Sequence, residues 1–181
     1  VEEQEEARHL LDVFSETFPT LLEFNGMKTS YGIESLLENQ IAQNPNILQI
    51  EQQIGSLERI QKVLLTNPNI KQRFEEVTTI HLEYSIKDLS GIEILNNITT
   101  MKLNYLCLQD ISQLQHLTNL LFLNVQWNDL REPTQLLHAK NNLWLKSFLF
   151  KSNPIFEYAI YQGQFYFDDE TYKKKEFECE E

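Results

Sequence analysis

Apolar residues in the second half of the chain follow a pattern that recurs along the sequence. In one copy, two apolar residues stand two positions apart, and further apolar residues then follow about every three positions. The copies begin at Val77, Ile98, Leu120 and Leu145. The interval is 22 residues from Ile98 to Leu120 and 25 from Leu120 to Leu145, and the first copy is one residue short near Ser85. Intervals of about 20 to 29 residues indicate a protein built from stacked units.

The two halves of each repeat predict different backbone conformations. The alternating pair, such as Met101 and Leu103 or Leu123 and Val125, places its apolar side chains on one face of a short strand. The three-residue spacing that follows is typical of a tight helical segment that returns to the start of the next strand. Each unit buries its apolar face only against its neighbours, and four copies exceed the usual minimum of about three.

The repeat resembles the leucine-rich-repeat family, in the short-repeat class of bacterial internalins and of regulatory subunits of a protein phosphatase. Its most typical piece is Leu117-Thr118-Asn119-Leu120 followed by Leu123-Asn124-Val125, and Leu145 to Ile155 restates LxxLxLxxNxI. The resemblance extends from Val77 to Ile155. It implies an α/β fold: a leucine-rich-repeat solenoid with parallel strands on its concave face. Leu106 and Ser85 stand where the family has Asn, so we expect an incomplete Asn ladder.

The apolar pattern of residues 1–76 predicts a helical cap at the N-terminal end of the repeats, which extend over residues 77–155. Helical spacing links Leu10, Leu11, Phe14 and Phe18, then Ile33, Leu36, Leu37 and Ile41, and finally Ile54, Leu57, Ile60, Val63 and Leu64. Asn44-Pro45-Asn46-Ile47 and Asn67-Pro68-Asn69-Ile70 each place a proline where a helix could begin. Residues 156–181 predict a C-terminal cap, in which Phe165 to Phe167 suggest a strand, and an acidic tail.

The positions between the buried strand residues are the candidates for contact with a partner, because side chains alternate across a strand. Tyr84, Tyr105 and Trp127 align in one column, with Phe122 on the strand of Trp127, and His81, Lys102 and Asn124 form a second column. The predicted partner-binding residues are Tyr84, Lys102, Tyr105, Phe122, Asn124 and Trp127. Aromatic residues are frequent in binding hot spots. The alternative is that these rings pack under the cap or an inserted loop.

Charge and cysteine content narrow the partners and the compartment. The formal net charge of -12 argues against nucleic acid and anionic membranes as partners, and it is compatible with a basic protein. The two cysteines, Cys107 and Cys179, have no CxxC spacing and no spaced histidines, so we expect neither a metal site nor a disulfide framework. Unpaired thiols and the lack of an apolar leader predict a cytoplasmic protein.

No catalytic motif is recognisable, and we expect no enzyme and no cofactor. GxSxG, HExxH, a Gly-rich phosphate loop and a dinucleotide fingerprint are all absent, and the carboxylates Asp168 to Glu170 more readily form a turn than a metal site. The sequence therefore predicts a protein–protein interaction module that binds through its concave face. Two alternatives remain: an immunity-type inhibitor of a basic toxin or enzyme, and a structural subunit of a larger assembly.

Overall fold

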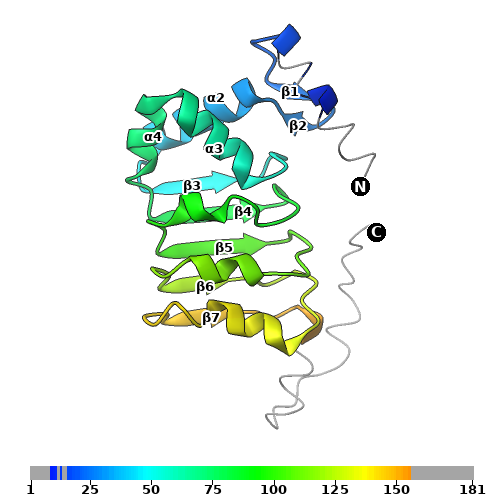
Figure 1. Cartoon of the computed structure of the whole chain (residues 1–181), viewed down its shortest axis with the longest axis vertical. Coiled ribbons are helices and arrows are strands. Elements are labelled where there is room, and N and C mark those ends of the chain that lie inside the picture. Colours follow the sequence, from blue (N-terminus) through cyan, green and yellow to red (C-terminus); the bar gives the residue numbers. More distant parts are fainter. Residues whose placement is uncertain (1–8, 12, 14–15, 156–181) are drawn as a thin grey trace.

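A single parallel sheet organises the chain in the computed structural model, which describes residues 9–11, 13 and 16–155. Its five strands are hydrogen-bonded in chain order, so each strand pairs only with the one before and the one after it (Figure 1). The strands are β3 (Ile47–Ile50), β4 (Thr79–Glu83), β5 (Thr100–Asn104), β6 (Phe122–Asn124) and β7 (Ser147–Leu149). The parallel pairing of the four repeat strands is as predicted.

One face of the sheet forms the core and the other does not. Alternate residues of β4 and β5 are fully buried, among them Leu82 and Leu103, while the residues between them are half-buried. A second buried row runs beside it through Ile80, Met101 and Leu123, which are partners in the register. We call the opposite face, lined by the half-buried residues, the outer face.

Short 3-10 helices return the chain from one strand to the next, as the three-residue spacing predicts. They are η1 (Ile92–Leu95), η2 (Ser112–His116) and η3 (Pro133–Ala139). Ile92, Leu95 and Leu114 belong to the same buried cluster as the inward residues of the strands. Gly91 precedes η1 with a φ of 85°, and a Cβ there would lie 2.5 Å from the backbone nitrogen of Glu58. Only glycine lets this turn approach α3 so closely.

Three α-helices gather at the β3 end of the sheet (Figure 1): α2 (Ser30–Gln43), α3 (Leu57–Thr66) and α4 (Pro68–Phe74). Two of the expected helices are confirmed as α2 and α3, and Ile54 precedes α3 as a buried residue. Helix α4 begins at Pro68 as predicted, capped by the Asn67 side chain, which accepts from the Ile70 N–H at 3.2 Å. Helical backbone also occurs at 9–11 and 16–17, while Phe14 lies outside the described residues.

The expectation of a helix at Pro45 is wrong, because the chain there enters β3. Leu48 and Ile50 are buried and their neighbours exposed, and the strand joins the sheet beside β4. The region expected to be a helical cap therefore supplies the first strand of the sheet. It also contains a small antiparallel pair, β1 (Glu23–Phe24) and β2 (Met27–Lys28), joined by Asn25 and Gly26 in left-handed backbone. Asn-Gly is a strong hairpin signal. The predicted C-terminal cap lies outside the described residues.

Candidate interaction surface

The outer face presents side chains in straight rows across the sheet, because the register has no slip between β3 and β6. His81 of β4 lies beside Lys102 of β5, which lies beside Asn124 of β6. The second column predicted from sequence is therefore present, and Gln49 of β3 extends it. Phe122 belongs to another row, beside Thr100 at the amino ends of the strands.

The three aromatic residues of the first column stack on one another. The ring centroids of Tyr84 and Tyr105 are 5.2 Å apart, those of Tyr105 and Trp127 are 5.6 Å apart, and both pairs are within 12° of parallel. This confirms the predicted stacking, and we call the three residues the aromatic ridge. Tyr84 is exposed and the other two are half-buried. Phe122 begins β6, whereas Trp127 lies beyond its end, so the expectation that they share a strand is wrong.

The ridge residues lie beyond the strands, in left-handed backbone, and not between buried strand residues as expected. Tyr84 directly follows β4, and Tyr105 directly follows β5. Their φ angles are 54° and 57°, that of Trp127 is 60°, and Ser152 has 62° at the equivalent place after β7. A bulky side chain is uncommon in this region, which costs roughly 1–2 kcal/mol for a residue with a Cβ. The sequence pattern gave no signal of this conformation.

Hydrogen bonds between turns hold the ridge backbone. The Tyr105 N–H donates to the Trp127 carbonyl at 3.1 Å, and the Trp127 N–H donates to the Lys151 carbonyl at 3.3 Å. At the other end, the Gln53 side-chain amide donates to the Tyr84 carbonyl. The backbone of all three ridge residues is therefore tied to neighbouring turns.

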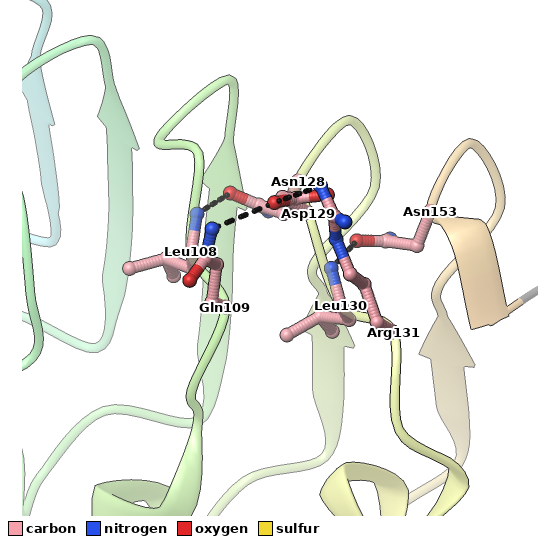
Figure 2. A network of polar contacts seen from close by, with 7 residues as sticks. All are labelled: Leu108, Gln109, Asn128, Asp129, Leu130, Arg131 and Asn153. Atoms are coloured by element: carbon pink, nitrogen blue, oxygen red, sulfur yellow. Dashed lines mark hydrogen bonds and ion pairs between the residues drawn. The ribbon is translucent and has the colours of Figure 1, made fainter. Parts of the chain in front are cut away.

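Two buried asparagines brace the turns that carry the ridge (Figure 2). The Asn128 Oδ1 accepts from the N–H groups of Leu106 and Leu108, both at 3.1 Å, and its Nδ2 donates to the Val125 carbonyl at 2.9 Å. Asn153 repeats the arrangement one turn later, accepting from the Leu130 N–H at 3.1 Å. These bonds satisfy backbone groups that burial would otherwise leave unpaired.

The Asn ladder is incomplete where the sequence predicts. Leu106 is buried in place of an asparagine, and the buried Ser85 hydroxyl has no hydrogen-bond partner in the described part of the chain. The segment before α3 substitutes for the missing rung, because the N–H groups of Ile54 and Gly55 donate to the Ser85 carbonyl at 2.9 and 3.2 Å.

A second set of asparagines, missed in the sequence pattern, braces the other end of the strands. The side-chain amides of Asn97, Asn119 and Asn141 each donate to a backbone carbonyl of the preceding turn, at 3.2, 2.7 and 2.8 Å. They recur every 22 residues, so the repeat interval itself was the signal that could have found them.

The polar column differs in exposure from one residue to the next. Asn124 is buried, and its Oδ1 accepts from the Gln126 N–H at 2.9 Å, so the expectation of an available contact side chain is wrong there. His81 and Lys102 are half-buried. Burial lowers the pKa of His81 below its ordinary value, the neighbouring positive charge of Lys102 lowers it further, and Glu83 opposes both. Burial of His81 therefore favours its neutral form.

Other features bear on the remaining expectations. Cys107 is disulfide-bonded, so the expectation of an unpaired thiol is wrong. The cysteines therefore do not support a reducing compartment. No helix in the described part of the chain combines the length and apolarity needed to cross a membrane. Among the same residues, no three His, Cys, Asp or Glu side chains gather where they could hold a metal ion. The carboxylates Asp168 to Glu170 lie outside the described residues.

The comparisons with known proteins add no relative. The chain matches no protein-family model, no curated protein and no solved structure.

Proposed function

We propose that the chain is a leucine-rich-repeat solenoid that acts as a protein–protein interaction module, with the aromatic ridge at the centre of its contact surface. The observation that carries the proposal is the stacking of three large rings at a backbone position where such residues are unfavourable. Glycine or asparagine would adopt this conformation at lower cost. Retaining Tyr84, Tyr105 and Trp127 there opposes stability, which is common at functional sites.

The environment of the ridge supports contact with a partner more than a role in the core. The buried hydrophobic cluster contains none of the three rings. Tyrosine and tryptophan bury large areas with few rotatable bonds, which makes them effective anchors in protein interfaces. The backbone hydrogen bonds at Tyr105 and Trp127 hold the rings in place before binding, so little ordering entropy is lost on association.

The sheet supports the solenoid part of the proposal. Strands pair in chain order, 3-10 helices return the chain, and asparagine rungs recur at the spacing of the sequence repeat. In such an architecture each unit contacts only its neighbours, and the strands line an extended surface suited to a protein ligand.

Differential capture tests the proposed function. The full chain is immobilised beside a Tyr105→Ala/Trp127→Ala variant and a control, Leu137→Ala/Trp144→Ala, which removes an exposed leucine and tryptophan elsewhere. A partner from a lysate of the source cells should bind the wild type and the control alike. The ridge variant should bind it at least about tenfold more weakly, a loss of about 1.4 kcal/mol.

Urea unfolding midpoints accompany each capture, because a misfolded variant would also lose the partner. If the alanine variant unfolds early, Tyr105→Asn/Trp127→Asn replaces it, since asparagine tolerates left-handed backbone. A stable ridge variant that binds every captured protein as well as the wild type does would contradict the proposal.

A further inference from the structure

The aromatic ridge ends in a ring face that nothing in its own stack covers. Tyr84 packs one face against Tyr105, at a centroid distance of 5.2 Å. No other ring in the described part of the chain stacks on its second face, and 49% of the residue is exposed. The face of a phenol ring carries the negative part of the π quadrupole, and it attracts cations that come within about 6 Å of the centroid.

Two carboxylates lie at the same end of the sheet as Tyr84. Glu83 is the last residue of β4 and directly precedes Tyr84. Glu51 directly follows Ile50, the register partner of Leu82, so it continues the row toward Glu83. Within the described residues, neither glutamate takes part in an ion pair. The Gln49 side chain donates to the Glu51 carboxylate, which holds that side chain at the surface.

We infer that the Tyr84 end of the ridge binds an arginine side chain of the partner protein. The inference rests on the proposed function and specifies the chemistry that the partner must bring. A guanidinium group is planar, so it can stack on the Tyr84 face opposite Tyr105 while its N–H groups donate to Glu83 and Glu51. Lysine offers a compact, strongly hydrated charge that cannot stack in this way. The formal net charge of -12 favours association of the chain with a basic partner.

A lysine on the outer face restricts where a cation of the partner can bind. Lys102 of β5 lies beside His81 of β4 and repels a second cation at the centre of the outer face. The arginine contact therefore belongs to the β3 and β4 end of the outer face, as a single anchor on the partner.

The probe for this inference is a capped tripeptide, acetyl-Gly-Arg-Gly-amide, added to the full ¹⁵N-labelled chain. Saturable shifts are expected at the amides of Glu83, Tyr84 and Glu51, with weak affinity because a single exposed contact is tested. The matched peptide contains citrulline, which keeps the shape of arginine without its charge, and a lysine peptide completes the set. We expect the order arginine, lysine, citrulline.

Two variants separate the site from general attraction. Tyr84→Leu keeps the net charge and removes the ring, and it should weaken binding of the arginine peptide by about two- to fivefold, the range of an exposed cation–π contact. Glu51→Gln/Glu83→Gln should weaken it at least as much. Glu75→Gln/Glu76→Gln removes the same charge from an exposed pair at the end of α4 and should leave binding unchanged.

The outcomes distinguish this inference from the proposed function. Shifts that do not saturate, equal binding of the citrulline peptide, or an equal loss in Glu75→Gln/Glu76→Gln would overturn the arginine site. If partner capture still depends on Tyr105 and Trp127 in that case, the interaction module stands without it. If the arginine peptide binds at Tyr84 but capture is indifferent to the ridge, the cation site stands and the proposed function fails.

Discussion

At the scale of single residues, the ridge is a place where side-chain chemistry overrides backbone preference. Tyr84, Tyr105 and Trp127 share positive φ angles of 54° to 60°. Hydrophobic alternation along a strand contains no information on φ, and aromatic residues are poor predictors of left-handed backbone. The stacking was therefore predictable from the alignment of copies, but the turn that presents the rings was not.

At position 105, a glycine variant should be more stable than an alanine variant, which reverses the usual order. In a helix or strand, a protein with glycine is less stable than one with alanine by roughly 0.5–1 kcal/mol. In left-handed backbone the preference reverses, because the Cβ of alanine costs roughly 1–2 kcal/mol there. Tyr105→Gly should therefore unfold at a higher urea concentration than Tyr105→Ala, although both lose the ring. An alanine variant as stable as the glycine variant would mean that Tyr105 does not hold this conformation in solution.

The charge state of His81 provides a second test at residue scale. Its pKa lies below the ordinary 6.5, first because of burial and then because of Lys102. The unfolded chain accordingly binds a proton at higher pH than the folded chain, so this group lowers stability progressively as the pH falls below 6.5. An NMR titration should show the His81 pKa rising in Lys102→Gln and falling in Glu83→Gln. Movement in the same direction in both would contradict the charge pattern of the outer face.

At the scale of elements, buried asparagines decide how firmly one turn is joined to the next. Asn128 satisfies two N–H groups of the preceding turn and Asn153 one, whereas the turn after β4 depends on backbone from the segment before α3. The turns are consequently joined by different means along the sheet, even though the apolar repeat is regular.

Replacing Asn128 by alanine should destabilise the fold by at least about 2 kcal/mol. The substitution leaves the buried N–H groups of Leu106 and Leu108 without an acceptor, and each such group costs about 1–3 kcal/mol. Asn119→Ala is the matched control, because that exposed side chain donates only to the Asn96 carbonyl, and it should cost about 0.5–1.5 kcal/mol. Equal urea midpoints for the two variants would show that the Asn128 rung is not the stronger brace.

At the scale of the whole molecule, the parts that could be predicted are those that repeat. Strands β4 to β7 and their 3-10 returns follow from the period, because each copy has to bury the same face. Strand β3 was missed because its alternation of Leu48 and Ile50 with exposed residues occurs once, after Pro45, without a neighbouring copy. Only its pairing with β4 makes it a strand, and that pairing is a tertiary contact that local pattern does not contain.

The candidate site follows the same division between repeated and local features. The columns of the outer face could be predicted because the register is regular, and His81 lies beside Lys102 as expected. The burial of Asn124 and the local hydrogen bond that its side chain accepts from the Gln126 N–H could not be predicted from strand alternation. Glu51 and Glu83 have no recurring pattern, and their importance appears only when β3 is placed beside β4.

The stack of rings also gives the protein an optical reporter on its own contact surface. The chain has two tryptophans, and they differ sharply: Trp127 is half-buried against Tyr105, whereas Trp144 is 77% exposed. Trp144→Phe would leave Trp127 as the sole indole, so tryptophan fluorescence, excited at wavelengths that tyrosine does not absorb, would then come from the ridge alone. Emission wavelength and quenching by acrylamide would follow occupancy of the surface directly, with no dye attached and no partner labelled.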